Sequence, residues 1–258
     1  MEKPVRLDKF LADAGAGTRS EVKKYIQKGQ VQVNGKPVKK PELKVTEEDQ
    51  VVMNGQEIHA APEYVYYLFN KPAGCVSATE DSRDKTVLDY IEEKDRRKGL
   101  FPVGRLDKDT EGFLLITDDG IFNQKLTHPS YHKEKTYEFT LLGDLTPELV
   151  HKLETGVILK GADTLTAPAK ITVTGHAVMS DILSTLPEEI QKDIHKNRPD
   201  HPITYGIITI SEGKKRQIRR MMKSVHCCVI ELKRISIGDI VLDKALCPGE
   251  WKEIFPHT

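Results

Sequence analysis

This chain has few cysteines, one tryptophan and no long apolar run. Its four cysteines, Cys75, Cys227, Cys228 and Cys247, show no Cys-x-x-Cys spacing, so we expect neither a disulfide framework nor a bound metal. No apolar run approaches the roughly 20 residues that a membrane helix needs, and the N-terminus is charged, unlike that of a signal peptide. These absences predict a cytoplasmic protein without a membrane partner.

The chain also has no net charge. Its 39 Lys and Arg residues balance 39 Asp and Glu residues, which argues against a wholly basic nucleic-acid binder. The basic residues are unevenly spread: residues 1–44 hold eleven Lys and Arg against five Asp and Glu, and residues 213–234 hold eight against one. Two basic segments of this kind can face one polyanion if the fold brings them together.

With 258 residues, 38% of them hydrophobic, the chain is long enough for a small domain and a large one. Residues 1–60 predict the small domain. Apolar residues at helical spacing predict a helix from Arg6 to Ala14, and Thr18 with Glu21 has the capping-box spacing that starts a second helix. Asn-Gly pairs at 34–35 and 54–55 are typical of tight hairpin turns between short strands.

The order of these residues resembles an S4 RNA-binding domain. The resemblance rests on three blocks in register, which are VRLDKFL at 5–11, GTRSEV at 17–22 and GQVQVNGK at 29–36. It implies that two helices present basic side chains to folded RNA, mainly through phosphates and shape. On charge alone, the same residues are explained equally well as ordinary solvated helix faces. The expected RNA contacts are Arg6, Lys9, Arg19, Lys23 and Lys28.

Residues 61–258 predict a larger α+β domain with a mixed, mostly antiparallel sheet, because strand patterns follow one another with little strict alternation of strands and helices. We expect strands over 64–69, 113–117, 135–141 and 203–211. Proline at 147 and glycine at 156 fit the start and end of a helix between them.

The most informative motif of this domain is GRLD at 104–107, which is followed by DTEG and the apolar run FLLITDDG. It places a carboxylate and a guanidinium on a glycine-punctuated loop before a strand that reads as buried. Rigid strands commonly position reactive loop residues, so Asp107 is a candidate nucleophile or acid/base with Arg105 beside it. Taken alone, the tetrapeptide is more typical of a solvated turn with a surface ion pair.

Further blocks in the same order resemble the pseudouridine synthases that carry an S4 domain, in particular their small-subunit branch. They are LFNKPAG at 68–74, the run at 104–120, KEKTY at 133–137, SEGKKRQIRRM at 211–221 and IELKRISIG at 230–238. The resemblance implies that uridine in rRNA is isomerised to pseudouridine by a monomer. That reaction breaks the bond from C1′ to N1 and forms one from C1′ to C5, and it needs no cofactor or metal.

The resemblance also implies the roles of individual residues. Asp107 matches the catalytic aspartate, Tyr137 the tyrosine that stacks on the extruded base, and Arg219 the basic residue that pairs with the aspartate. Without the resemblance, Tyr137 is more typical of a core residue and Arg219 of a phosphate-facing helix. The remaining expected substrate contacts are Arg105 on the backbone or in the gap left by the base, Ile218 lining the pocket, and Arg216 and Arg220.

Two segments depart from the small-subunit pattern. Residues 176–202, with a predicted helix over 179–196, form a longer connection than the pattern has. Residues 215–217 read Lys-Arg-Gln and are more typical of the large-subunit branch. Against these departures, the strand pattern over 132–141 and the closing C-terminal strand are more typical of the small-subunit branch. The resemblance therefore favours 16S rRNA as substrate and leaves 23S rRNA as the alternative. A catalytically silent RNA-binding assembly factor is a third hypothesis, against which the presence of Asp107, Tyr137 and Arg219 argues.

Overall fold

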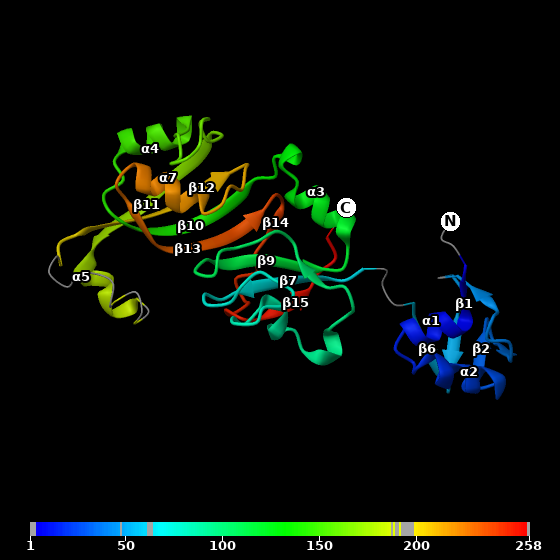
Figure 1. Ribbon diagram of the computed structural model, residues 1–258. Coiled ribbons are helices and arrows are strands. Elements are labelled where there is room, and N and C mark those ends of the chain that lie inside the picture. Colours follow the sequence, from blue (N-terminus) through cyan, green and yellow to red (C-terminus); the bar gives the residue numbers. More distant parts are fainter. Residues whose placement is uncertain are drawn as a thin grey trace. The chain divides into compact units, whose positions relative to one another are not determined.

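The computed structural model describes residues 4–46, 48–60, 64–186, 188, 191 and 199–256. The chain divides into two compact units, Met1–Glu63 and Tyr64–Thr258 (Figure 1). Each unit has its own hydrophobic core. Within the described residues, no helix is both long and apolar enough to cross a membrane.

The first unit packs two helices on small antiparallel sheets. Its helices are α1 (Leu7–Asp13) and α2 (Arg19–Gln27). One sheet pairs β1 (Val5–Arg6) with β4 (Lys44–Val45), and the other has the order β3 (Lys36–Val38), β2 (Val31–Val33), β5 (Val51–Met53), β6 (Gln56–Ile58).

Local sequence signals explain how these helices and turns form. The amide of Glu21 donates to Thr18 Oγ1 at 3.3 Å, and the amide of Thr18 donates to Glu21 Oε2 at 2.8 Å, which confirms the predicted capping box. Asn34 and Gly35 have φ angles of 50° and 74°. Positive φ at both positions is what a tight hairpin turn of this kind requires, so the hairpin between β2 and β3 is confirmed.

The second unit is built on a nine-stranded sheet, and its predicted mixed, mostly antiparallel character is confirmed. Its main path runs in the order β11 (Ala169–Val178), β12 (Pro202–Ile210), β10 (Lys135–Leu142), β13 (Cys228–Ile237), β9 (Glu111–Thr117), β7 (Tyr66–Lys71), β15 (Trp251–Glu253). Two short strands lie off this path: β8 (Phe101–Pro102) pairs with β9, and β14 (Ile240–Val241) pairs with β13.

The sheet has one parallel junction, at which β13 and β9 pair over only two residues on each strand. Gly112 lies at this junction with φ of 95°, and a Cβ there would lie 2.2 Å from the carbonyl oxygen of Arg234. Only glycine permits this approach of the two backbones. The junction thereby joins β9, which follows the loop of Asp107, to β13, which pairs with the strand that holds Tyr137.

Helices cover the sheet on both sides of this junction. The largest hydrophobic cluster includes residues of α4 (Pro147–Thr155) and α7 (Gln217–Ser224) with strands β10 to β13, and a second cluster packs α3 (Gly120–Thr127) on β7 and β9. The predicted start of α4 at Pro147 and its end before Gly156 are confirmed. The strand β11 was not predicted from the sequence.

The predicted helix over 179–196 is shorter in the described part. It consists of α5 (Met179–Ile182) and a 3-10 turn, Leu183–Thr185, and most of the remainder lies outside the described residues. Buried Met179 and Ile182 pack against Ile203 of β12. This packing anchors the start of the 176–202 segment to the sheet.

Candidate active site

Asp107 lies on the loop that joins β8 to β9. Its neighbour Leu106 is buried, whereas the Asp107 carboxylate keeps partial exposure. Ser77 fixes the loop, because its Oγ donates to the Leu106 carbonyl and accepts from the Leu106 amide, both at 3.0 Å. The amide of Thr110 donates to the carbonyl of Asp107 at 3.1 Å. The backbone of Asp107 is thus held on both sides while its carboxylate remains accessible.

Lys71, the last residue of β7, donates hydrogen bonds to the backbone of the same loop. Its side chain is completely buried, and its Nζ donates to the carbonyls of Pro72 and Thr110 at 2.9 Å and of Lys108 at 3.3 Å. Burial lowers the pKa of Lys71, since removal from water disfavours the charged form. Lys71 was not among the predicted site residues, although it lies within the block at 68–74.

Arg219, on α7, reaches the segment that follows Asp107. Its Nη1 donates to the carbonyl of Val229 at 3.0 Å, and its Nη2 forms an ion pair with Asp109 at 3.2 Å. Arg216 forms an ion pair with the same carboxylate oxygen at 3.0 Å. The partner of Arg219 therefore differs from the predicted one: within the described residues its ion pair is with Asp109, two positions beyond Asp107.

Burial shapes the chemistry of Arg219. The pKa of Arg219 is lowered, first by burial and against the opposing charges of Asp109 and Asp107. Its Nε is buried and has no hydrogen-bond partner. The guanidinium is thus incompletely paired, and it lies close enough to Asp107 for the two charges to interact.

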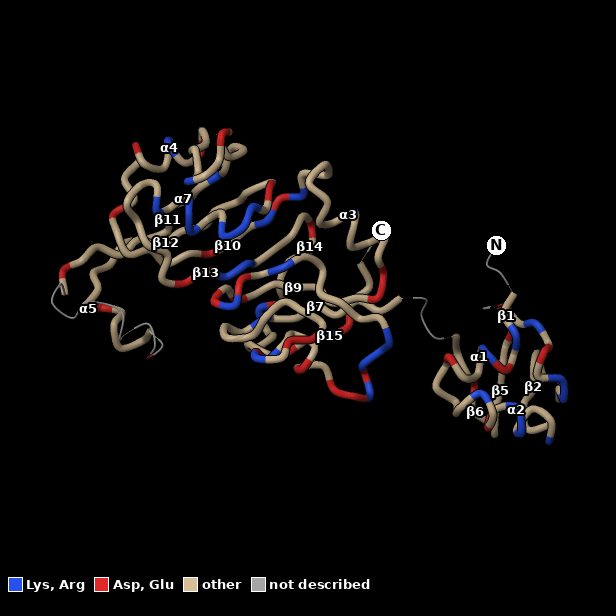
Figure 2. The backbone as a smooth tube through the Cα atoms, in the orientation of Figure 1, with Lys and Arg blue, Asp and Glu red and all other residues tan. Residues whose placement is uncertain are grey.

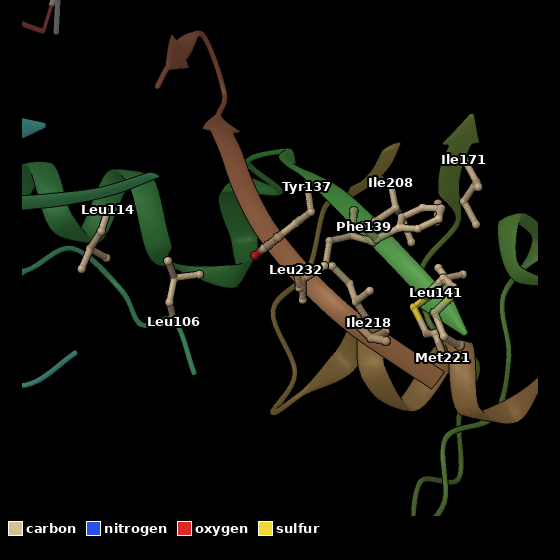
Figure 3. Packing of buried hydrophobic residues seen from close by; sticks show 14 of the residues in the cluster. Leu106, Leu114, Tyr137, Phe139, Leu141, Ile171, Ile208, Ile218, Met221 and Leu232 are labelled. Carbon is tan, nitrogen blue, oxygen red and sulfur yellow. The ribbon is translucent and has the colours of Figure 1, made fainter. Parts of the chain in front are cut away.

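Tyr137 lies on β10 and is 8% exposed. It stands opposite Ile208 of β12 and Arg234 of β13. Figure 3 shows its ring extending from β10, with its hydroxyl toward the side on which Leu106 lies. Ile218 of α7 belongs to the same buried cluster. One cluster thereby brings together Tyr137, Ile218 and Leu106, the immediate neighbour of Asp107.

The other predicted contacts have different environments. Arg105 is exposed on the loop. Arg220 uses part of its donor capacity within the protein, because its Nη2 donates to the carbonyl of Lys160 at 2.6 Å. In the first unit, Lys9 and Lys28 are exposed. Basic residues mark α7 and the neighbouring strands of the second unit, and both helices of the first (Figure 2).

Three cations of the first unit gather on one carboxylate. Asp8 is completely buried, and its oxygens lie 3.0 Å from Arg6, 3.5 Å from Arg19 and 3.7 Å from Lys23. The hydrogen bond from Arg6 is the main cause that lowers the pKa of Asp8 to about 2. Asp8 therefore stays ionised and fixes the positions of three of the five predicted RNA contacts.

The face of the large sheet opposite to that of Tyr137 has more acidic than basic residues around a pocket. A pocket of about 480 Å³ lies there, with Glu111, Glu138 and Glu231 against Lys233 among its lining residues. Glu138 alternates with the inward Tyr137 along β10, which places it on the other face. Three carboxylates against one ammonium disfavour a nucleic-acid phosphate, so the face with Tyr137 and α7 is the better candidate for RNA.

The described residues contain no group of three or more His, Cys, Asp or Glu side chains that could hold a metal ion. The chemistry available from the arranged residues is that of an accessible carboxylate, a buried guanidinium and an aromatic ring. A carboxylate can act as a nucleophile or stabilise positive charge that develops on a sugar.

Comparisons with known proteins identify the families that the chain matches. Residues 5–51 match the S4 domain, and residues 65–224 match the family RNA pseudouridylate synthase. An uncharacterized RNA pseudouridine synthase, YtzG, from Bacillus subtilis (strain 168) is 40% identical over 97% of this chain and 95% of its own. A crystal structure of a pseudouridylate synthase has a TM-score of 0.60 and 30% identity, and covers 97% of this chain and 96% of its own.

Two further relatives are named for different ribosomal subunits. Ribosomal large subunit pseudouridine synthase B of Bacillus subtilis (strain 168) is 37% identical over 98% of this chain and 93% of its own. Ribosomal small subunit pseudouridine synthase A of Haemophilus influenzae (strain ATCC 51907 / DSM 11121 / KW20 / Rd) is 33% identical over 97% of this chain and 96% of its own.

Proposed function

Because this chain belongs to the RNA pseudouridylate synthase family, we propose that it converts specific uridines of rRNA to pseudouridine. The observation that carries this proposal is the position of Asp107. Ser77 bonds the backbone of the preceding Leu106, Lys71 bonds the carbonyl of Thr110 on the same loop, and Asp107 itself is partly exposed. Leu106 shares a buried cluster with Tyr137. A reactive carboxylate needs this combination of fixed backbone and open side chain.

We propose 16S rRNA as the substrate and keep 23S rRNA as the second candidate. The pattern from 132 to 141 and the closing strand favour the small subunit, whereas Lys215-Arg216-Gln217 and the 37% identity to a large-subunit synthase favour the large one. Relatives of similar identity are named for both subunits. The target therefore has to be read from the RNA itself.

The chemistry follows from the residues in the proposed site. Asp107 acts at C1′ of the ribose, as a nucleophile or by stabilising positive charge, while the bond to N1 breaks. The ring of Tyr137 contacts the freed uracil while it turns to present C5, and a new bond forms from C1′ to C5. The proton that C5 carried is lost to solvent, and N1 gains a proton from solvent. Atoms are conserved, because the product is an isomer.

Extruding the uridine from a paired region costs a few kcal/mol. Contacts by the basic residues of the first unit and of α7 offset this cost. Arg105, exposed on the Asp107 loop, is placed to fill the gap that the base leaves or to contact the backbone.

The test is to map pseudouridine in 16S and 23S rRNA from cells that lack this protein and from the same cells complemented with variants. We expect one or a few modifications to disappear, to return with the wild type, and to stay absent with Asp107→Asn, because the amide keeps the shape but not the charge. The matched control is Asp163→Asn, an exposed aspartate of the same unit, which should restore them.

An rRNA whose pseudouridines are unchanged without the protein would favour the silent assembly factor. Loss of modification in 23S rather than 16S rRNA would transfer the target to the second candidate. With purified protein, Asp107→Asn should bind the RNA within a few-fold of the wild type and show no turnover.

A further inference from the structure

Arg234 is a buried cation with an incomplete set of partners. The residue is 2% exposed, and its Nε donates to the carbonyl of Phe113 at 2.9 Å across the junction of β13 and β9. Its Nη2 is buried without a hydrogen-bond partner. Among the described residues it forms no ion pair within 4.0 Å. Burying a guanidinium without an anion costs free energy. An anion from outside the chain would therefore stabilise this arrangement.

Lys135 adds a second cation to the same place. It is half-buried on β10, and its Nζ donates to the carbonyl of Lys133 at 2.8 Å, which leaves two of its three N–H groups available. Burial and the charge of Arg234 both lower the pKa of Lys135, and no carboxylate opposes them. The charge of Arg234 thus disfavours the charged form of Lys135, and one anion near both side chains would compensate their charges.

Both cations lie beside Tyr137. Arg234 stands opposite Tyr137 across the ladder between β13 and β10. Lys135 precedes Tyr137 by two residues on the same strand, so their side chains leave the same face of the sheet. A ligand on the ring of Tyr137 would therefore have an anion-binding pair at its edge.

We infer that Lys135 and Arg234 form a subsite for one backbone phosphate of the RNA, next to the uridine whose base contacts Tyr137. The inference rests on the proposed function for the identity of the ligand. A phosphate carries the full negative charge that the two cations need, and the unpartnered Nη2 of Arg234 is a donor for it. A uracil carbonyl would accept hydrogen bonds but would leave the two charges uncompensated.

A phosphate contact at this subsite does not depend on base sequence, yet it helps to position the one nucleotide that reacts. A phosphate held at the edge of Tyr137 fixes the ribose that connects it to the base, and positioning of this kind lowers the cost of reaching the reactive geometry. Phosphate contacts position a nucleic acid without reading its sequence.

The test measures binding of an rRNA stem-loop that carries the mapped uridine, as a function of salt. Lys135→Met should raise Kd about five- to tenfold at fixed salt and reduce the slope of log K against log salt by about one, because one phosphate contact is lost. The matched control is Lys170→Met, a surface lysine of the same unit that pairs with Glu134 at 2.8 Å. It removes the same charge and should change the slope little. Arg234→Lys tests the second cation, with circular dichroism to verify folding.

A second arm locates the phosphate. A neutral methylphosphonate at each position flanking the target uridine is compared in wild type and in Lys135→Met. At one position the neutral linkage should weaken wild-type binding about as much as Lys135→Met does, and the two changes together should weaken it no further. Additive losses at every position, or a slope for Lys135→Met equal to that of Lys170→Met, would overturn the subsite.

Wild-type turnover of the unmodified stem-loop reports on the proposed function separately. If the wild type does not isomerise the uridine, the proposed function fails, whereas the salt slopes still decide whether Lys135 and Arg234 hold a phosphate. If turnover is present and the slopes do not differ, only the subsite is wrong.

Discussion

Each unit of this protein gathers cations on one aspartate, and the two aspartates differ in burial. Asp8 of the first unit is 0% exposed and the side chains of its partners Arg6, Arg19 and Lys23 are 46%, 55% and 45% exposed. In the second unit, the side chains of Asp109 and Arg216 are 48% and 47% exposed, whereas that of Arg219 is 14% exposed. The acid is the buried member in one case and an exposed member in the other.

This difference separates a fixed frame from an exchangeable contact. A phosphate cannot replace the buried Asp8, so Asp8 keeps its three cations in position while their outer faces remain free for RNA. Asp109 is accessible, so a phosphate can take its place. The cost is small at the exposed Arg216, because exposed ion pairs contribute roughly 0–1 kcal/mol, and larger at Arg219, which is only 14% exposed. We expect removal of the first aspartate to damage the frame and removal of the second to release cations.

The largest effect is expected from Asp8→Asn. It leaves three cations around a neutral side chain, and the first unit should lose about 2–3 kcal/mol of stability. This is less than the roughly 3–5 kcal/mol that an unpaired buried charge costs, because the three cations are about half exposed. Hydrogen exchange of peptides from α1 and α2, followed by mass spectrometry, measures this locally. Asp13→Asn, at the exposed end of α1, is the control. Equal protection in the two variants would show that Asp8 is not part of the frame.

A smaller effect is expected from pH. The pKa of Asp8 is lowered from 3.8 to about 2, so its contribution to stability is complete well above pH 4 and is lost as pH falls toward 2. The loss should be about 1–2 kcal/mol, reduced from the full linkage value because the partner cations are half exposed. Exchange protection of α1 measured between pH 5 and pH 2.5 should decline in the wild type more steeply than in Asp8→Asn. Parallel declines would mean that another carboxylate is responsible.

The sequence predicts local structure better than these charge contacts. The capping box at Thr18 and the Asn34-Gly35 turn depend on residues within a few positions, and both are confirmed. The ion pair of Arg219 depends on which residue of a distant loop faces α7. The resemblance named Asp107, and the structure has Asp109. A two-residue difference along a loop cannot be read from spacing, because it depends on how the loop turns.

Buried charges were missed for a related reason. Asp8 and Lys71 lie in the blocks at 5–11 and 68–74 that carry the family resemblances. Charged residues are mostly exposed in proteins, so the sequence alone gives no reason to expect either one to be buried. Two of the three carbonyls that Lys71 contacts, those of Lys108 and Thr110, depend on the course of the loop at 108–110, and the third is that of Pro72. The strand β11 escaped prediction as well, and its pairing with β12 contains a register shift between Val173 and Gly175.

The last prediction tests the exchangeable contact through Asp109→Asn. If Asp109 occupies the arginines until RNA arrives, its removal frees Arg216 and Arg219, and RNA binding should become two- to fivefold tighter with a salt slope steeper by about one. Arg219 keeps its hydrogen bonds to the backbone carbonyls of Asp109 at 3.1 Å and Val229 at 3.0 Å, so the single-turnover rate should stay within about twofold of the wild type, or about 0.4 kcal/mol. Tighter binding at an unchanged rate is a combination that general destabilisation does not produce.

Two matched variants sharpen this prediction. Asp84→Asn removes an acid of the same unit that pairs with Lys108 at 2.6 Å rather than with α7, and it should leave the affinity nearer to that of the wild type. Asp109→Glu keeps the charge on a longer side chain and should recover wild-type affinity. Asp8→Asn is expected to weaken RNA binding, since it disturbs the frame that presents three cations. Weaker binding by Asp109→Asn as well would mean that both aspartates are frames, and that the difference in their burial has no functional consequence.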